Sequence, residues 1–419
     1  MAHLLIVELP GGNDTDIIEA AIQRGDRFTF LTSDLSHYQN QPFVRDGVGQ
    51  ARQQIEIKDF SYEQVEQAVL EINAEYPFDA ILCLIDTRIV DCARLAKKLG
   101  LRFLNPDSAK MLRDKFSVRQ KLQESGIEQG EFALATSNRE LRAAVEKIGL
   151  PVLIKPSDGY GSQNIVVLRN PEDLDPLLTP VDDLLPIRAD YGFGVRSNDR
   201  LLVERYMEGT VVGCDTFTEN RWHRMLGINE KLLCEPPSFT IRGGCFLPNR
   251  REFDEIEGYV FALLDAVDFD WGATHIELML TKEGPRLIEI NPRLVGAKIG
   301  RLVSASLGIS IHQALIALHC GETSLLSRPV SNMPAVSRWI LGTEAGILDC
   351  VNLPSLNDKR IRHVEIMKAS GDYIKPAFEN VDRIGYVMVC ATTRLEAEQL
   401  ADRFIAGCEV KIRKTDSRT

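Results

Sequence analysis

Short apolar runs alternate with segments of helical spacing at the start of the chain. The apolar runs predict strands at residues 3–9, 27–31 and 80–85. Apolar side chains recur every three or four positions at residues 14–24, 60–72 and 89–99, which predicts helices there. Strands that alternate with helices favour a parallel sheet. We therefore expect an N-terminal parallel α/β (Rossmann-like) domain over residues 1–106.

A smaller, β-rich region follows the break Asn-Pro-Asp-Ser at 105–108. One helix is predicted over 109–125, ahead of short strands at 131–135, 152–155 and 165–168. Asp, Pro and Gly are frequent at 176–197, which predicts a loop. We expect a small central domain, which would serve as a lid, over residues 107–203.

Strand-like segments resume at Leu201 and dominate the rest of the chain. Further strands are predicted at 211–218, 224–231, 275–280 and 286–290, and helices at 251–267 and 295–319. The final residues alternate strand and helix, ending with 385–393 and 395–406. We expect an antiparallel-sheet domain over 204–419 with an α/β extension from about 325, so the chain combines the α/β and α+β classes.

The segment from His275 to Arg293, here called the acidic hairpin, carries the clearest chemistry. Apolar and polar residues alternate on both sides of the turn Lys-Glu-Gly. If the turn is centred on residue 283, Glu277 pairs with Glu289 and His275 pairs with Asn291. One face then collects these four polar side chains, and the other face is aliphatic.

Two carboxylates placed directly across a strand pair repel each other. A hard divalent cation removes that repulsion, and the all-oxygen set of Glu277, Glu289 and Asn291 suits Mg²⁺ or Mn²⁺. The alternative is an ordinary surface hairpin whose polar face lies in water. Pro292 ends the strand and places Arg293 just beyond this face, in a position to hold an anion.

A lysine and a glycine-rich loop form a second group. An apolar strand delivers Lys155, and residues 156–164 (Pro-Ser-Asp-Gly-Tyr-Gly-Ser-Gln-Asn) lead back to the next strand. Backbone N–H groups of such a loop approach phosphate oxygens closely. The spacing excludes a Walker-type loop, and the Gly-Gly turn at 11–12 lacks the dinucleotide fingerprint, which leaves substrate-side lining or a plain turn.

Composition and charge exclude several classes of function. The 419 residues are 44% apolar and carry 49 Lys and Arg against 60 Asp and Glu, a net charge of −11. An acidic surface repels phosphate backbones, so a nucleic-acid partner is not expected. No apolar run is long enough to cross a membrane, and the first residues resemble a strand more than a signal peptide. The nine scattered cysteines predict free thiols and a cytoplasmic protein.

The motifs together resemble the ATP-grasp superfamily of carboxylate–amine ligases. Their order is Lys115 at a helix start, Lys155, the glycine loop, Glu204 at a strand end and then the acidic hairpin. The resemblance covers about residues 106–320. Within the superfamily the chain is most similar to ATP-dependent L-amino-acid ligases that make dipeptides, including those of bacilysin-type and dapdiamide-type antibiotic biosynthesis.

The resemblance implies a role for each motif. Lys115 and Lys155 would contact ATP phosphates, Glu204 would accept from the adenine amino group beside the Tyr206 backbone, and Glu277, Glu289 and Asn291 would hold Mg²⁺ or Mn²⁺. Arg293 would steady an acyl phosphate. Relatives place a ribose-binding Glu where this chain has Thr210 and Val211, so Glu208 is the substitute. The residues expected to close over the phosphates are Gly159, Gly161, Ser162, Gln163 and Asn164; of these, Gly161 and Ser162 are assigned to catalysis together with Lys155 and Arg293.

Substrate contacts are less clearly encoded. Arg242 lies in a segment expected to be a flexible connection ending in a Gly pair, where it either binds an amino-acid carboxylate or is a solvated loop residue. His275 either touches substrate or hydrogen-bonds Asn291, and we favour the second role. Gly296 opens the next predicted helix, where backbone donors would help to hold an anion; Lys298 is expected to be exposed.

The expected function is ATP-dependent formation of an amide or peptide bond. A carboxylate would be activated as an acyl phosphate and attacked by the amine of an L-amino acid, releasing ADP and phosphate. The expected ligands are ATP and two small molecules, with a homodimer as the expected assembly because dimers are common in the family. The alternatives are a bicarbonate-activating, carboxylase-like enzyme and an ATP-binding module without turnover.

Overall fold

The N-terminal domain contains a four-stranded parallel sheet. The computed structural model describes residues 1–12, 14–159, 164–178, 187, 190–192, 195–196, 199–234, 241–296, 298–322, 331–376 and 383–414. The strands are β1 (His3–Val7), β2 (Arg27–Thr32), β3 (Gln53–Glu56) and β4 (Ala80–Cys83). Their order is β3-β2-β1-β4, and every pair is parallel. The predicted parallel domain is confirmed.

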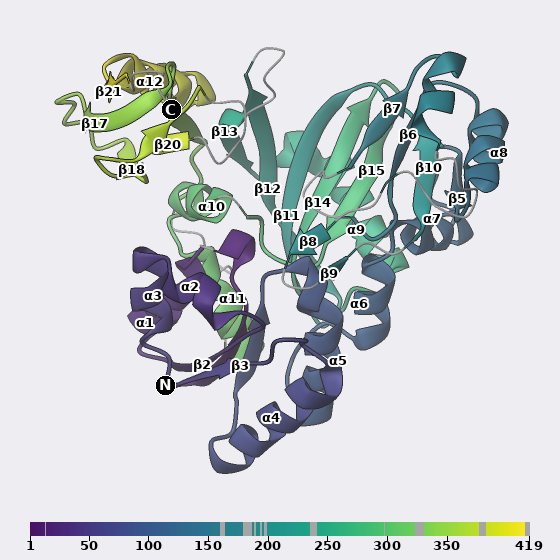
Figure 1. Cartoon of the computed structure of the whole chain (residues 1–419), viewed down its shortest axis with the longest axis horizontal. Helices are drawn as coiled ribbons and strands as arrows, with labels where there is room; N and C mark the ends of the chain where they lie inside the picture. Colours follow the sequence, from purple (N-terminus) through teal and green to yellow (C-terminus); the bar gives the residue numbers. More distant parts are fainter. Residues whose placement is uncertain are drawn as a thin grey trace.

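Helices cover this sheet at the lower end of the molecule in Figure 1. A left-handed glycine, Gly25, ends α1 with φ 75°, a conformation that glycine adopts without strain. The short helices α2 and α3 and the strand β3 were not predicted. The helices of this domain are α1 (Asp16–Arg24), α2 (Leu35–Gln39), α3 (Pro42–Val48), α4 (Tyr62–Glu75) and α5 (Ile89–Leu99), with 3-10 turns at Pro10–Gly12 and Asp86–Arg88.

The central domain is a small antiparallel sheet flanked by helices. The order β5-β10-β6-β7 joins β5 (Phe132–Ala135), β6 (Val152–Pro156), β7 (Val166–Leu168) and β10 (Leu201–Arg205). Helix α8 (Asn138–Ile148), which was not predicted, packs on β5 and β10. The strand β10 crosses the domain boundary that the sequence suggested at 203/204.

The single helix predicted over 109–125 is wrong, because two helices occupy this segment. They are α6 (Pro106–Leu112) and α7 (Lys115–Glu124). The side chain of Asp114 caps α7 by accepting from the backbone N–H of Phe116. This cap makes Lys115 the first helical residue of α7, as the motif required.

An eight-stranded sheet forms the body of the molecule. Its order is β15-β14-β11-β12-β13-β16-β20-β18, from right to left in Figure 1. The helix α9 (Asp254–Ala266), preceded by a 3-10 turn at Arg251–Phe253, packs on β12. The strands are β11 (Thr210–Glu219), β12 (Trp222–Leu233), β13 (Ile241–Pro248), β14 (Trp271–Thr281), β15 (Gly284–Asn291), β16 (Ala335–Leu341), β18 (Ile361–Ile366) and β20 (Arg383–Cys390).

The sequence predicted a flexible connection that ends in the Gly pair 243–244. For the described residues this prediction is wrong, because both glycines belong to the strand β13. A Cβ on Gly243 would lie 2.4 Å from the Ser337 carbonyl oxygen, and one on Gly244 would lie 2.9 Å from the Glu230 carbonyl oxygen. The two glycines therefore allow close contact between β13 and its neighbouring strands.

The single helix predicted over 295–319 is also wrong. The helices α10 (Ile299–Leu307) and α11 (Ile311–Cys320) meet at 89°, at Gly308 with φ 69°. Among the described residues no single helix is long and apolar enough to cross a membrane. The bent pair of α10 and α11 has the necessary length and apolar composition only when its two helices are counted together. Helix α11 packs on α1 and β4, and so joins the N-terminal domain to the rest of the chain.

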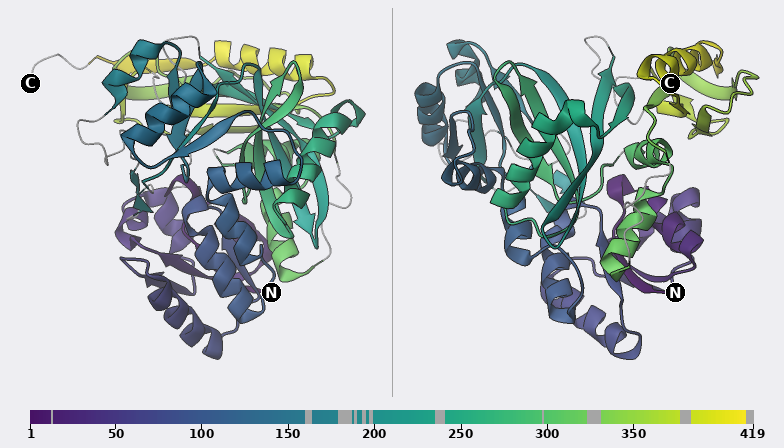
Figure 2. Two further views of the ribbon diagram at one scale, coloured as in Figure 1. Left: turned by 90° about the vertical axis from the view of Figure 1, so that its right-hand side faces the viewer. Right: turned by 180° about the vertical axis from the view of Figure 1, so that it is seen from behind.

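The last part of the chain lies above the N-terminal domain in both views of Figure 2. A three-stranded sheet of order β19-β17-β21 stands beside the helix α12 (Arg394–Ala406), which packs on β16 and β20. Its strands are β17 (Gly346–Asn352), β19 (Tyr373–Ile374) and β21 (Glu409–Arg413). Within the predicted loop at 176–197 the structure describes short strands β8 (Asp190–Gly192) and β9 (Val195–Arg196), after 3-10 turns at Pro171–Asp173 and Asp175–Leu177.

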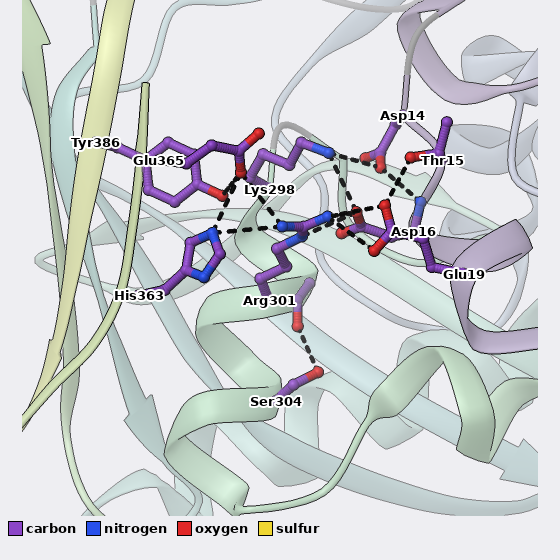
Figure 3. A network of polar contacts seen from close by, with 11 residues as sticks. Asp14, Thr15, Asp16, Glu19, Lys298, Arg301, Ser304, His363, Glu365 and Tyr386 are labelled. Carbon is purple, nitrogen blue, oxygen red and sulfur yellow. Dashed lines mark hydrogen bonds and ion pairs between the residues drawn. The ribbon is translucent and has the colours of Figure 1, made fainter. Parts of the chain in front are cut away.

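Arg301 on α10 ties three parts of the molecule together (Figure 3). Its guanidinium lies 2.6 Å from Asp16 on α1, and 3.2 Å from both Glu19 on α1 and Glu365 on β18. Asp16 is almost fully buried. One cation therefore balances acids from the N-terminal helix and from the far strand of the large sheet.

We predict that Arg301→Met destabilises the protein by about 2–3 kcal/mol, because it leaves the buried Asp16 without its main partner. Arg221→Met is the matched control, since its pair with Asp268 is more than half exposed on both sides, and should cost less than about 1 kcal/mol. Urea unfolding of both variants measures the difference. Equal losses would show that the Arg301 contacts do not join the domains energetically.

Candidate functional site

The acidic hairpin has the pairing that the sequence predicted at its polar end. Glu277 pairs with Glu289, and His275 pairs with Asn291, on β14 and β15. The turn differs: Thr281 pairs with Gly284, so the turn is centred between residues 282 and 283. A bulge restores the predicted register, since Leu278 pairs with Leu287 and Ile288 is the extra residue.

The polar face of the hairpin is enclosed. The side chains of Glu277 and Glu289 are 14% and 16% exposed. His275 and Asn291 are buried. The alternative of a surface hairpin with its polar face in water is therefore wrong.

Lysines from two other elements compensate the acidic pair. Lys231 on β12 lies 2.8 Å from Glu277, and Lys115 on α7 lies 3.1 Å from Glu289. Burial alone would raise the pKa of Glu277, but the neighbouring His275 and Lys231 hold that pKa well below its usual range. The two carboxylates thus coexist in this structure without requiring a metal ion to separate them, which corrects the electrostatic part of the sequence argument.

The donor set still fits a hard cation. Asn291 donates through Nδ2 to Glu289 (3.1 Å) and to the carbonyl of His275 (3.3 Å), so its Oδ1 is the atom that would hold a cation. Two carboxylates and an amide oxygen are ligands that Mg²⁺ accepts. No group of three or more His, Cys, Asp and Glu suited to a metal occurs in the described residues, so a softer, nitrogen- or sulfur-rich site has no support there.

His275 lies between two acids and is held as a cation. Its Nδ1 is 2.9 Å from Asp215 and its Nε2 is 3.6 Å from Glu277. Burial would lower the pKa of His275, but Asp215 and Glu277 raise it to about 9. A Cβ on Gly213 would lie 2.4 Å from the ring, so only glycine leaves room for it. The expected structural role agrees with this geometry, although the ring contacts Asp215 and Glu277 while Asn291 contacts the His275 backbone.

A second ion cluster lies on the central sheet. Lys155 on β6 is 2.5 Å from Glu204 on β10. Burial would raise the pKa of Glu204, but Lys155 and Arg119 hold it below its usual value. Burial lowers the pKa of Lys155, and the nearby cations Arg119 and Lys115 lower it further against the opposing effect of Glu204. The lysine and the glutamate singled out in the sequence are therefore direct partners.

Arg119 is the member of this cluster that sequence reasoning missed. It lies on α7, is almost fully buried, and is 3.3 Å from Glu204. Its Nη2 donates to the carbonyls of Leu287 and Ile288, both at 2.9 Å. Those carbonyls belong to the bulge of the acidic hairpin. The available signal was its spacing, because Arg119 follows Lys115 by one helical turn and so shares its face.

Lys115 connects the glycine loop with the acidic hairpin. Its ammonium donates to the Gly159 carbonyl as well as contacting Glu289, and its backbone N–H donates to the Ser157 carbonyl at 2.7 Å. Gly161, Ser162 and Gln163 lie outside the described residues, and Asn164 is exposed with φ 56°. The structure thus brings Lys115, Lys155, Glu204 and the hairpin together through direct contacts.

Several predicted residues lie apart from these clusters. Glu208 is exposed just after β10, Tyr206 faces Arg169, whose guanidinium is 4.8 Å from the ring centre, and Arg242 is exposed at a bulge in β13. The prediction that Gly296 opens the next helix is wrong, because α10 begins at Ile299. The Gly296 carbonyl accepts from the Ile299 N–H at 3.2 Å. None of these side chains contacts the acidic hairpin in the contacts described.

Two basic residues after the hairpin contact the N-terminal domain. Arg293 lies 2.7 Å from Asp86, and the attraction of Asp86 raises the pKa of Arg293 against the opposing effect of burial. Lys298 was expected to be exposed, which is wrong: its side chain is 16% exposed and lies 3.2 Å from Asp14 and 3.1 Å from Asp16. Its backbone is left-handed, with φ 65°, so these contacts hold a strained residue in place.

We predict a pH-dependent contribution of His275 to stability in the absence of divalent cations. Because its pKa is raised from 6.5 to about 9, the stabilisation is fully present below about pH 6.5 and is lost as the pH rises through about 9. The loss is on the order of 3 kcal/mol. Urea unfolding at pH 6.5, 8 and 9.5 measures it, and His275→Gln should flatten this part of the profile. An unchanged profile in the variant would contradict the assignment.

Two family models match parts of the chain. Residues 148–301 match the family model described as ATP-grasp domain, and residues 338–413 match L-amino acid ligase C-terminal domain 2. An uncharacterized protein of Sinorhizobium fredii is 27% identical over 76% of this chain and 65% of its own length. An L-arginine-specific L-amino acid ligase of Bacillus subtilis is 22% identical over 60% of each chain. The chain thus spans less than two thirds of the length of these curated relatives.

A solved structure extends the likeness to the whole fold. The L-amino acid ligase from Bacillus licheniformis superposes with a TM-score of 0.77 at 18% identity and covers 99% of both chains. At this identity the likeness concerns the fold. All nine cysteines are free, as expected, whereas the cytoplasmic location and the homodimer stay predictions.

Proposed function

Since the chain contains an ATP-grasp domain and an L-amino acid ligase C-terminal domain, we propose that it is an ATP-dependent ligase that joins a carboxylic acid, itself an amino acid or similar to one, to the amine of an L-amino acid. The observation that supports this proposal most directly is the contact between Lys115 and Glu289. Lysine ammonium groups are suited to binding phosphate, and glutamate carboxylates are suited to binding Mg²⁺. Here the two lie 3.1 Å apart on an enclosed face.

The reaction would proceed in two displacements. A carboxylate oxygen of the first substrate attacks the γ-phosphorus of ATP, the bond to the β-phosphate oxygen breaks, and ADP leaves. The nitrogen of the second substrate then attacks the acyl carbon, phosphate leaves, and the nitrogen loses a proton to give the amide. The product keeps the acyl carbon of the first substrate and the carboxylate of the second.

The side chains would act mainly by placing charge. Lys155 and Lys115 would hold phosphate oxygens, and Glu204 would accept from the adenine amino group once Lys155 turns to the phosphates. Arg293 would steady the acyl phosphate if it exchanged Asp86 for that anion. Glu277, Glu289 and Asn291 would hold Mg²⁺, which supplies charge stabilisation at the transferring phosphoryl group.

Burial of these groups serves the same chemistry. An acyl phosphate is hydrolysed by water, so the face on which it forms has to be closed. The low exposure of Glu277 and Glu289 supports a site of this kind. The ribose contact of Glu208, the substrate contact of Arg242 and the roles assigned to Gly161 and Ser162 stay predictions, as does a place in antibiotic biosynthesis.

We predict that Glu289→Gln lowers ATP-dependent phosphate release at least 100-fold, because it removes a charge from the metal-binding set and from the partner of Lys115. The measurement is phosphate release over pairs of amino acids and small carboxylic acids, with mass spectrometry of the products. Glu283→Gln, in the exposed turn of the same hairpin, is the matched control and should retain activity.

The same screen separates the alternatives. Phosphate release that needs bicarbonate and no amino acid would favour a carboxylase-like reaction. Tight binding of ATP without ADP formation across the whole panel would favour a binding module. Full activity of the Glu289→Gln variant would contradict the proposed site.

A further inference from the structure

A cleft, here called the junction cleft, opens where the N-terminal domain meets the large sheet. Its walls come mainly from α1, α10, α11 and β18, and its volume is about 260 Å³. Because one ordered water needs about 10–15 Å³ by the same measure, the space admits a small organic molecule. Among the described residues that line it, none belongs to the acidic hairpin or to the ion cluster of the central sheet. The junction cleft is therefore separate from the proposed reaction centre.

A buried histidine lines the junction cleft without a hydrogen-bond partner. His312, in the first turn of α11, is 7% exposed, and its ring makes no hydrogen bond with any residue that the structure describes. A Cβ on Gly300 of α10 would lie 2.8 Å from the ring, so this glycine leaves room for it. An unsatisfied buried polar group favours a ligand that completes its hydrogen bonds.

The inner wall of the cleft consists of hydrogen-bond acceptors. Burial lowers the pKa of His312, although the carboxylates of Asp16 and Asp14 attract its cationic form. At neutral pH the ring is therefore neutral, with one nitrogen that donates and one that accepts. Asp16 also lines the cleft. Its Oδ1 accepts from Arg301 and Lys298, whereas its Oδ2 is buried without a partner among the described residues. This wall favours a ligand that donates.

Acids outnumber cations around this wall. In the ion pairs of the described residues, four acids share two cations (Figure 3): Asp14, Asp16, Glu19 and Glu365 contact Lys298 and Arg301. His363 contacts Glu365 as well, at 3.2 Å. Charges away from water are tolerated when they are balanced. A donor that carries a positive charge, such as an ammonium group, therefore fits this wall better than a hydroxyl group.

The outer end of the cleft presents a cation. Arg362 on β18 is exposed and lines the cleft beside His363. Neighbouring strand residues normally face opposite sides, but a bulge between Ile361 and His363 makes Arg362 the extra residue, so both side chains reach the cleft. Its guanidinium hydrogen-bonds the Cys390 thiol and has no acid partner in the part of the chain that the structure describes. A guanidinium matches the two oxygens of a carboxylate.

We propose that the junction cleft is a second binding site, and that its ligand is a small zwitterion with one free ammonium group and one free carboxylate. The ammonium donates to His312 and lies against Asp16, the carboxylate binds Arg362, and the carbon atoms contact Ala305 and Met388. The ligand thus joins the N-terminal domain to the far strand of the large sheet. The site goes beyond the proposed function, and only the choice between a substrate amino acid and a product dipeptide as its ligand rests on that function.

The first test removes one charge of the ligand at a time. Calorimetry without ATP gives the affinity of the whole protein for L-alanyl-L-alanine, for its N-acetyl derivative, which lacks the ammonium group, and for its C-terminal amide, which lacks the carboxylate. A hydrogen bond to a charged group corresponds to about 10- to 100-fold in affinity. Wild type should bind the zwitterion better than each derivative by that factor.

The variants should each remove one of these two preferences. His312→Leu should bring the zwitterion and its N-acetyl derivative to within about threefold and keep the preference over the amide. Arg362→Gln should do the reverse. A folding defect weakens all three ligands alike, so the two ratios separate recognition from misfolding.

Matched controls lie on the same elements of the chain. His319→Leu changes a second buried histidine of α11, and Arg360→Gln changes an exposed arginine just before β18; neither residue lines the cleft. Both controls should keep both preferences. Unchanged preferences in His312→Leu and Arg362→Gln would overturn the assignment, because the zwitterion would then bind elsewhere. Absence of binding by wild type at millimolar concentration would overturn it as well.

The same titrations identify the source of the ligand and keep the two proposals apart. Tighter binding of L-alanyl-L-alanine than of L-alanine supports a product dipeptide, and the reverse supports a substrate amino acid. If the two preferences are lost as expected but no amino acid pair supports phosphate release, the junction site stands and the proposed ligation fails. If phosphate release depends on Glu289 while His312 and Arg362 do not affect binding, the ligation stands and the junction site fails.

Discussion

Two glutamates face each other across a strand pair in an enclosed part of this protein, and their charge has to be balanced from outside the hairpin. Lys231 balances one of them from within the same sheet, and Lys115 balances the other from a helix of the central region. Buried charges are tolerated only when paired. The position of α7 against the large sheet is therefore part of the electrostatic solution, and Arg119 on the same helix adds bonds to the carbonyls of the hairpin.

The same principle governs the junctions with the N-terminal domain. Asp86 meets Arg293 directly after the hairpin, and Asp14 and Asp16 meet Lys298 a few residues later. Each contact joins a residue near the proposed reaction centre to a domain that supplies none of the phosphate-binding groups. Changes in the N-terminal domain would thus reach the site through ion pairs as well as through the apolar contact of α11 with α1 and β4.

Local periodicity predicted three of the four strands of the N-terminal sheet, but it missed β3 and the helices α2, α3 and α8. Alternation along the hairpin predicted the two decisive pairings. Local periodicity failed where a tertiary contact decides the outcome. Gly243 and Gly244 look like a flexible joint, whereas they serve close strand packing in β13. The sequence pattern runs through Gly308 as if one helix continued there, because α10 and α11 are both apolar. The helix α8 did carry a signal, since Leu141, Ala144, Val145 and Ile148 follow helical spacing. Ion pairs between domains, such as that of Lys298, have no local signature.

The bulge at Ile288 separates the tip of the hairpin from its polar end. On one side the register is set by the two-residue turn, and on the other side by the pairing of Glu277 with Glu289. A peptide inserted between Lys282 and Glu283 would extend the exposed tip and leave the pairing of Glu277 with Glu289 unchanged. The tip of the hairpin is therefore a suitable place for a tag or a reporter close to the reaction centre.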